Sequence, residues 1–558
     1  MTSIASAWTP GLVTLRHYRR RWLGGDVMAG ITVAAYLVPQ VMAYATVAGL
    51  PPVAGLWASL APMAVYALLG SSRQLSVGPE STTALMTASA LAPLVVGDPG
   101  RYAAMAAVLA LLVGGICLVA GLCRLGFLAD LLSRPVLVGY MTGVAVIMIG
   151  GQLGKVTGVP VSGEEFVEQV RSFAAHVREW HPPTLALSAG VLTLLLVANR
   201  LFPRFPGALF AVLAAAAAVA LFALDEKGIR VVGDIPAGLP APGLPGVSGA
   251  DLTALLIPAV GVAMVAFSDN TLTARTFAAR KRQNIDVNAE LRALGLCNLT
   301  AGVTQGFPVS SSGSRTALGD TVGSRTQVYS LVMLASVVLI MFGGRGVLEH
   351  FPMPALGALV IYAAWRLIDI GEFARLARFR RSELLLALAT TAAVLGIGVL
   401  YGVLVAIALS ILDLLRRVAR PHDGVLGYVP GLAGMHDVDD YSDAVPVPGL
   451  VVYRYDAPLF FANAENFRER AIAAVDQSPG PVEWFVLNAE ANVDPDLTAV
   501  DALEQLRRDL NRRGIVFAMA RVKQDLRDDL EVAGFLGRVG EDRIFATLPT
   551  AVDAFRNR

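Results

Sequence analysis

The chain has 558 residues, of which 55% are hydrophobic and 16% are charged. Soluble domains carry about 25% charged residues, so this composition indicates a protein embedded largely in lipid. The formal net charge of +1 excludes nucleic-acid binding through bulk positive charge. The three cysteines are an odd number with no metal-site spacing, so neither a disulfide framework nor a metal site is expected.

Residues 1–24 form a basic tail without the apolar region and cleavage site of a secretory signal. Apolar runs then follow one another through residues 25–418, and they predict about 14 membrane-spanning segments. The clear runs are 29–50, 53–69, 103–122, 136–149, 185–197, 208–224, 252–267, 328–342, 356–364, 384–400 and 403–415. Shorter, more polar segments begin at Thr82 and Thr316, and another covers 291–303.

Arginines mark every second loop between the predicted spans. Arg16 precedes the first span, and Arg73, Arg124, Arg378 and Arg416 recur at alternate loops. Positive loops remain on the cytoplasmic side, so both termini are expected in the cytoplasm. The sequence therefore predicts a multi-pass protein of the plasma (inner) membrane, in contact with membrane lipid.

The chain changes character after the last apolar run. Residues 419–445 contain prolines, glycines and aspartates and are expected to form a solvated linker. In residues 446–558, predicted strands at 450–455, 484–487, 515–520 and 544–546 alternate with predicted helices at 464–475, 498–510, 526–533 and 551–555. This alternation predicts a small layered α/β domain in the cytoplasm.

Two distant segments of the membrane region echo each other. Ser81-Thr82-Thr83-Ala84-Leu85 matches Ser314-Arg315-Thr316-Ala317-Leu318, and each follows a polar, glycine-containing interruption. Paired interruptions in two halves of a membrane protein indicate broken helices that aim their N-termini at a bound substrate. Because the second copy carries an arginine, the expected substrate is an anion.

The first span contains a proline and two polar side chains that share one helix face. Gln40 and Tyr44 are four residues apart, and both can donate hydrogen bonds to an oxyanion. We expect them to line the substrate site. The alternative is that Gln40 satisfies a backbone carbonyl freed by Pro39 while Tyr44 only packs.

An acidic residue follows the 252–267 run, at what we expect to be the end of that span. Intramembrane carboxylates usually line transport pathways or proton relays. Asp269 is therefore expected to couple transport, either as a proton carrier or as a sodium ligand together with Thr273. The alternatives are that it caps a broken helix or pairs with Arg315.

Arg315 is the strongest candidate for anion recognition. It falls in the first turn of a half-helix, where its charge adds to the free N–H groups, and its forked guanidinium suits an oxyanion. Ser311, Ser312 and Ser314 supply hydroxyl donors beside it. The alternative role of Arg315 is an internal salt bridge with Asp269 or Glu80.

The first copy of the echo contributes Ser81 and Thr82 as further donors and Glu80 as an acidic neighbour. The sequence leaves three roles open for Glu80: a second proton carrier, a partner of Arg315, or a side chain that is turned away from the site.

These residues lie within motifs that resemble the SulP (sulfate permease) family of anion transporters over nearly the whole chain. The motifs are Val38-Pro39-Gln40 with Ala43-Tyr44-Ala45 and Gly49-Leu50-Pro51-Pro52, Thr273-Ala274-Arg275, Asn288-Ala289-Glu290-Leu291, Gly306-Phe307-Pro308, and Ser314-Arg315. The resemblance implies 14 segments in two inverted repeats of seven, the uracil-permease-like fold, elevator-type transport and a homodimer. It assigns the anion site to Gln40, Tyr44, the Pro79–Thr82 turn and Ser314-Arg315, with Asp269 nearby.

Residues 446–558 resemble the STAS domain of the same family, through the segment Leu459-Phe460-Phe461-Ala462-Asn463. In related anti-sigma-factor antagonists, a phosphorylated serine lies in a turn that here reads Asp496-Leu497-Thr498. Thr498 is a regulatory candidate or, alternatively, a helix N-cap. A cytoplasmic regulator could bind through this domain.

We therefore expect a secondary active importer of sulfate or a related oxyanion, coupled to protons or sodium, with no enzymatic activity and no cofactor apart from a coupling Na⁺. Three alternatives stay open: sodium-coupled bicarbonate or dicarboxylate uptake, an uncoupled anion channel or exchanger, and a membrane signalling protein that acts through the STAS domain. No nucleophile–base constellation suggests an enzyme.

Overall fold

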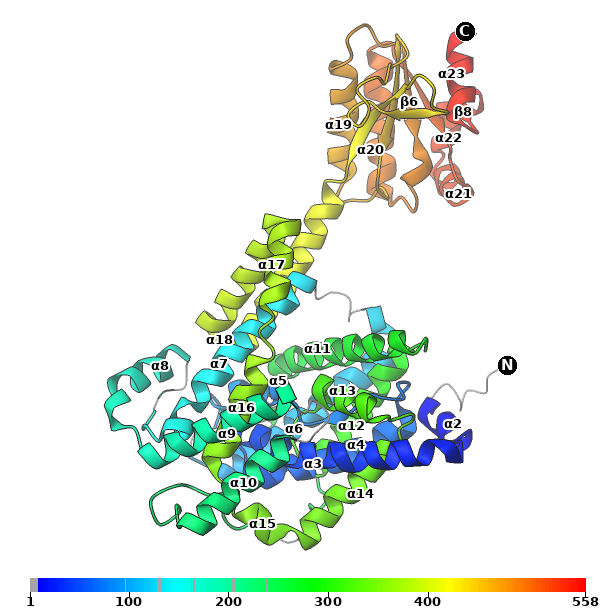
Figure 1. Cartoon of the computed structure of the whole chain (residues 1–558). Helices are drawn as coiled ribbons and strands as arrows, with labels where there is room; N and C mark the ends of the chain where they lie inside the picture. Colours follow the sequence, from blue (N-terminus) through cyan, green and yellow to red (C-terminus); the bar gives the residue numbers. More distant parts are fainter. Residues whose placement is uncertain are drawn as a thin grey trace. The chain divides into compact units, whose positions relative to one another are not determined.

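The computed structural model describes residues 9–95, 97–127, 133–161, 163, 166–201, 207–236 and 238–558. The chain divides into two compact units, Met1–Ser410 and Ile411–Arg558. The first unit is helical apart from the two-residue strands β1 and β2, and the second is an α/β unit (Figure 1).

The first unit contains two successive sets of membrane helices. The first set is α3 (Leu23–Val47), α4 (Pro52–Leu69), α5 (Ser81–Leu91), α6 (Pro99–Leu122), α7 (Arg134–Thr157), α9 (Pro182–Leu201) and α10 (Gly207–Phe222). The second set is α11 (Gly249–Arg280), α12 (Val287–Val303), α13 (Gly313–Val322), α14 (Val328–Gly343), α16 (Met353–Trp365) and α18 (Arg381–Ala419). Because α18 is interrupted at Gly398, where φ is 83°, each set supplies seven segments.

The prediction of a polytopic helical membrane fold is confirmed. Seven helices in the described part of the chain are long and apolar enough to cross a membrane, and α9, α10 and α14 are shorter apolar helices. The third segment of each set, α5 or α13, is short, as a half-helix requires. Three peripheral helices were not predicted: α8 (Phe166–Ala175), α15 (Arg345–Glu349) and α17 (Ile370–Phe379).

Two expectations for this unit need correction. The first eight residues of the predicted tail 1–24 lie outside the described residues, but α2 (Pro10–Arg16) is helical and Gly11 lies against the backbone of Ala67 in α4. The span expected to end at residue 267 continues without a break to Arg280. The helix can continue through a polar residue when its side chain finds a partner inside the protein. Asn270, for example, is fully buried and donates to the Glu290 carboxylate at 2.9 Å.

Glycines bring α6 and α12 into close contact beside the half-helices. A Cβ atom on Gly114 would lie 2.6 Å from the backbone nitrogen of Leu299, and one on Gly295 would lie 2.7 Å from that of Leu118. Such small residues let membrane helices approach closely where lipid provides no hydrophobic driving force. The α6–α12 pair is therefore closely packed next to the interrupted segments.

The second unit is a six-stranded sheet with the order β4-β3-β5-β6-β7-β8. Its strands are β3 (Asp423–Tyr428), β4 (Met435–Asp437), β5 (Leu450–Tyr455), β6 (Trp484–Asn488), β7 (Val516–Ala520) and β8 (Ile544–Phe545). The four strands from β5 to β8 are parallel, and β3 and β4 are antiparallel. Helices α19 (Ala464–Asp476), α20 (Leu497–Arg512) and α21 (Gln524–Val532) cover one core, and α23 (Leu548–Arg556) covers the other (Figure 1).

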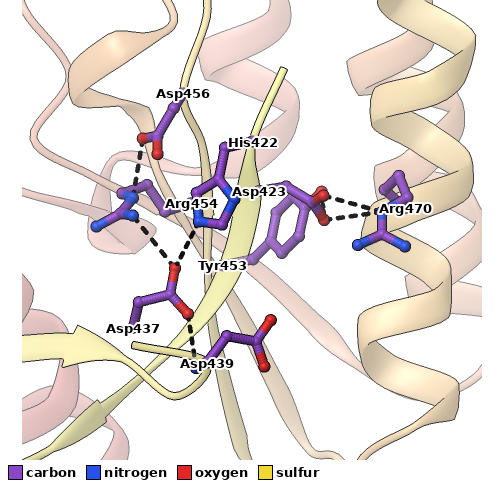
Figure 2. A network of polar contacts seen from close by, with 8 residues as sticks. All are labelled: His422, Asp423, Asp437, Asp439, Tyr453, Arg454, Asp456 and Arg470. Carbon is purple, nitrogen blue, oxygen red and sulfur yellow. Dashed lines mark hydrogen bonds and ion pairs between the residues drawn. The ribbon is translucent and has the colours of Figure 1, made fainter. Parts of the chain in front are cut away.

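The predicted linker 419–445 is wrong, because β3 and β4 lie inside it. Asp437, expected to keep this segment solvated, is only 2% exposed. Its carboxylate accepts from Arg454 at 3.2 Å and from the backbone N–H of Asp439 at 3.0 Å, and it contacts His422 at 3.1 Å (Figure 2). These polar contacts offset the burial of the aspartate and fix the antiparallel strands to β5.

Candidate functional site

The two echoing interruptions meet in space. β1 (Val77–Gly78) pairs antiparallel with β2 (Ser310–Ser311), with Val77 opposite Ser311 and Gly78 opposite Ser310. The helices α5 and α13 begin directly after these strands. An antiparallel pair relates two equivalent strands by a local two-fold axis, as an inverted repeat requires.

Buried polar side chains hold this pair of strands in place. Asn298 of α12 accepts from the backbone N–H of Val309 at 2.9 Å and donates to its carbonyl at 3.0 Å. Gln327 donates to the carbonyls of Ser72 and Leu75 at 2.9 Å each. The backbone N–H of Ser76 donates to Thr316 Oγ1 at 3.0 Å, which joins the two echoes directly. The half-helix N-termini are thus positioned by the surrounding helices.

A cavity of about 260 Å³ lies at these helix N-termini. Seven of the nine residues predicted to bind substrate or coupling ion line it: Tyr44, Glu80, Ser81, Thr82, Ser314, Asp269 and Thr273. They come from α3, α5, α11 and α13. The structure therefore brings most of the predicted site together around one small polar cavity.

The other two predicted residues, Gln40 and Arg315, lie behind the cavity wall. Arg315 is completely buried, and its Nη1 donates to Gln40 Oε1 at 3.1 Å and to the carbonyl of Pro79 at 2.9 Å. Gln40 Nε2 in turn donates to Tyr44 Oη at 3.0 Å and to Ser314 Oγ at 3.5 Å. The amide of Gln40 therefore links the buried guanidinium to two side chains that line the cavity.

The charge of Arg315 is not neutralised by an adjacent carboxylate. Within the described residues, no ion pair joins Arg315 to Asp269 or Glu80, so the alternative of an internal salt bridge is not supported. The Nη2 atom of Arg315 has no hydrogen-bond partner. A buried, unpaired cation is costly in a low-dielectric environment. An anion in the neighbouring cavity would offset that cost.

Glu80 caps the first half-helix. Its Oε2 accepts from the backbone N–H of Thr82 at 2.9 Å and from Ser81 Oγ at 2.6 Å. A carboxylate at this position interacts favourably with the positive end of the helix. The side chain is therefore not turned away: it lines the cavity and occupies the α5 N-terminus. The second half-helix is capped by a neutral hydroxyl, since Ser312 Oγ accepts from the N–H of Arg315 at 3.5 Å.

Asp269 lies in the interior of α11, one helical turn before Thr273. Its side chain is half-buried at the cavity wall. The alternative that Asp269 caps a broken helix is wrong, because α11 is continuous there. Two carboxylates, Asp269 and Glu80, thus border a cavity of only about 260 Å³.

Sequence reasoning missed three lining residues with polar side chains: Tyr36, Tyr362 and Arg366. Arg366 is exposed, follows the last residue of α16, and lies with its guanidinium carbon 5.9 Å from the Tyr362 ring centroid. Tyr36 could have been found from the sequence, because it precedes Gln40 by one helical turn. Arg366 could not, because it follows an apolar run as an ordinary loop arginine does. All three also line a second cavity of about 240 Å³, which extends to Thr321 on α13.

The regulatory candidate Thr498 is exposed in the first turn of α20. The N-cap of this helix is Asp496, whose carboxylate accepts from the N–H of Ala499 at 2.8 Å. The N-cap alternative for Thr498 is therefore wrong, and its hydroxyl is accessible to solvent.

Comparison with protein families gives two matches. The model of the sulfate permease family matches residues 23–390, and the model of the STAS domain matches residues 441–551. Over 557 residues the chain is 67% identical to a probable sulfate transporter of Mycobacterium tuberculosis, and the match covers 100% of both proteins. It is 31% identical to a probable sulfate transporter of Arabidopsis thaliana, over 97% of this chain and 83% of the relative.

Two solved structures share the fold. The murine Solute Carrier 26 family member A9 anion transporter, in an inward-facing state, matches with a TM-score of 0.91 at 22% identity, over 100% of this chain and 95% of that one. The transmembrane domain of the cyanobacterial bicarbonate transporter BicA matches with a TM-score of 0.62 at 24% identity, over 71% of this chain and 98% of that domain.

Proposed function

The chain belongs to the sulfate permease family, and from this premise we propose that it imports sulfate or a related small oxyanion by secondary active transport. The function of the family is transport, so no enzymatic step is invoked. The observation that carries the proposal is the cavity of about 260 Å³ between the N-termini of α5 and α13, backed by the unpaired guanidinium of Arg315.

An anion in this cavity would meet several hydrogen-bond donors. Thr82 and Ser314 contribute hydroxyl groups, and α13 contributes the positive end of its dipole, whereas Ser81 and the N-terminus of α5 already donate to Glu80. Arg315 supplies a full positive charge through one layer of side chains, with its orientation fixed by Gln40 and Pro79. These features select for negative charge without distinguishing between oxyanions of similar size.

The two carboxylates in the cavity support coupled transport. At an effective dielectric constant of about 20, a carboxylate and a monovalent anion about 6 Å apart repel each other by about 3 kcal/mol, and a divalent anion doubles this repulsion. A proton on Asp269 or Glu80, or a sodium ion at Asp269 and Thr273, would remove this repulsion. Anion binding would then require uptake of a proton or sodium ion, and that requirement is coupling.

The arrangement of the cavities supports access to the site from one membrane face, and elevator-type alternating access is part of the proposal. The second cavity leads from Ser314 along α13 to Thr321. The residue after α13, Gly323, lies near the start of α3: the carboxylate of Asp26 accepts from the N–H of Arg325 at 2.6 Å. The site therefore opens toward the membrane face where α3 begins, which the arginine pattern assigns to the cytoplasm.

The remaining expectations are part of the same proposal. We place the protein in the plasma (inner) membrane as a homodimer, with both termini in the cytoplasm. A cytoplasmic regulator would act through the STAS domain, with Thr498 as the accessible hydroxyl.

The decisive test is radiotracer uptake into proteoliposomes that contain the full chain. Sulfate, bicarbonate and a dicarboxylate are compared under separately imposed proton and sodium gradients. Sulfate uptake that accumulates above equilibrium only with one gradient supports the proposal. Uptake that ignores both gradients would replace it with an uncoupled channel or exchanger, and the absence of any anion uptake would refute it.

A further inference from the structure

A third, larger polar cavity shares no lining residue with the central one. It has a volume of about 950 Å³ and is formed by the C-terminal end of α7, the segment around η3 (Val177–Glu179), the N-terminus of α9, the first residues of α16 and the loop after α10 that carries Arg230. Two backbone hydrogen bonds close its walls: His181 N–H donates to the carbonyl of Thr157 at 2.8 Å, and Met353 N–H donates to that of Arg230 at 2.9 Å.

This cavity lies on the opposite face of the membrane from α17. Arg134, the first residue of α7, forms an ion pair with Glu372 of α17 at 2.8 Å. Lys155, which lines the cavity, follows on the same helix at a distance of about 32 Å, because 21 residues rise about 1.5 Å each. This distance equals the thickness of the hydrocarbon core, about 30 Å. Under the arginine pattern the cavity therefore faces the exterior.

The charged side chains of the cavity favour anions. Among the lining residues that the structure describes, Lys155 and Arg230 are basic and Glu179 is the one carboxylate. His176 and His181 add imidazole groups, and Trp180 lies exposed among them. A concave surface with an excess of one sign of charge raises the local concentration of counter-ions.

Lys155 connects this cavity to the helix that carries the central site. Its Nζ donates to the carbonyl of Thr46 at 3.4 Å, and Thr46 follows Tyr44 by two residues on α3. The ordinary role of a lysine at a helix C-terminus is to neutralise the carbonyl end of its own helix. Here the ammonium group instead contacts a different helix, and the side chain lines a polar cavity.

We propose that this cavity is an outer capture site for small inorganic oxyanions, with Lys155 and Arg230 as its anion-binding residues. The proposal rests on the proposed transport of oxyanions but concerns a separate site. An anion held by Lys155 would compete for its contact with the Thr46 carbonyl. Capture would thereby weaken a contact between α7 and α3 on the exterior face, next to the segment that carries Tyr44.

Trp180 allows binding to be measured without transport. The full chain in nonionic detergent is titrated with iodide, an anionic quencher, and with acrylamide, a neutral one. The Trp180 contribution is the difference between the wild type and Trp180→Phe. We expect sulfate, compared with gluconate at equal ionic strength, to protect Trp180 from iodide and not from acrylamide.

Substitutions locate the binding charges. Lys155→Gln and Arg230→Gln are each expected to lower iodide quenching of Trp180 about two- to fivefold. The reason is that the loss of one partly screened positive charge lowers the local concentration of iodide. Lys155→Arg should preserve it. Arg178→Gln is the matched control, because Arg178 is an exposed arginine of η3 that does not line the cavity. Phosphatidylcholine vesicles with and without phosphatidylglycerol distinguish a free oxyanion from a lipid phosphate.

The outcomes separate this proposal from the proposed function. Sulfate protection that requires Lys155 and Arg230 supports the capture site, even if proteoliposomes show no sulfate uptake and the transport proposal fails. If sulfate gives no protection, or if Arg178→Gln acts as strongly as Lys155→Gln, the capture site is refuted, even if uptake is normal. Competition by phosphatidylglycerol without protection by sulfate would instead indicate a lipid headgroup site and would also overturn it.

Discussion

Replacement of Arg315 by glutamine tests the central electrostatic idea. The substitution removes one positive charge and keeps a side chain that can donate a hydrogen bond to Gln40 or to the Pro79 carbonyl. Because Arg315 is completely buried and has no carboxylate in contact, its charge is poorly screened and acts on the cavity directly.

The size of the effect should depend on the charge of the substrate. If the guanidinium lies about 8 Å from the bound anion, at an effective dielectric constant of about 20, its loss costs about 4 kcal/mol for a divalent anion and about 2 kcal/mol for a monovalent one. These energies correspond to about 1,000-fold and 30-fold weaker binding. A purely structural role predicts the same loss for both anions.

The assay is the half-saturating concentration for sulfate and for nitrate in proteoliposomes. Arg315→Lys, which keeps the charge, should recover much of the affinity. Arg366→Gln is the matched control: its side chain is exposed, so both anions should weaken by less than about tenfold. Equal losses for sulfate and nitrate in Arg315→Gln would refute the electrostatic role and leave Arg315 as a packing residue.

Three further predictions address the carboxylates. Asp269→Asn should abolish the dependence of uptake on a proton or sodium gradient while anion exchange persists; unchanged gradient dependence would make Asp269 structural. Glu80→Gln keeps an oxygen that caps α5 but removes a negative charge from the cavity, so sulfate should bind more tightly by up to about tenfold at alkaline pH, and weaker binding would contradict this reasoning. In the STAS unit, hydrogen bonds from Arg507 and Arg508 lower the pKa of Glu504 to about 2. Because this pKa is depressed, the ionised Glu504 contributes about 1–2 kcal/mol of stability after allowance for solvent screening. This contribution is present above pH 4.5 and is lost as the pH falls toward 2. Glu504→Gln should remove that part of the acid-unfolding curve, as followed by limited proteolysis of this unit.

Local sequence patterns identified the membrane helices and the two helix interruptions because their physical causes are local. Apolar length predicts a membrane span, and the repeat of Ser81-Thr82 in Ser314-Arg315 marks both half-helices. The linker prediction failed because short strands with aspartates resemble a solvated segment until their partners are known. The burial of Asp437 is offset in part by Arg454, which belongs to a strand that follows it in the chain and supplies a compensating charge.

The sequence by itself determined the class of protein, the order of its segments and the residues at the two helix interruptions. Only the tertiary structure decided which of these residues face the cavity. Arg315 and Gln40 lie behind the cavity wall, Glu80 caps α5 in front of it, and Arg366 joins from the end of a different helix. The reason is that side-chain direction at a junction of broken helices depends on how β1, β2 and α12 pack together, and no segment of the chain specifies that packing alone.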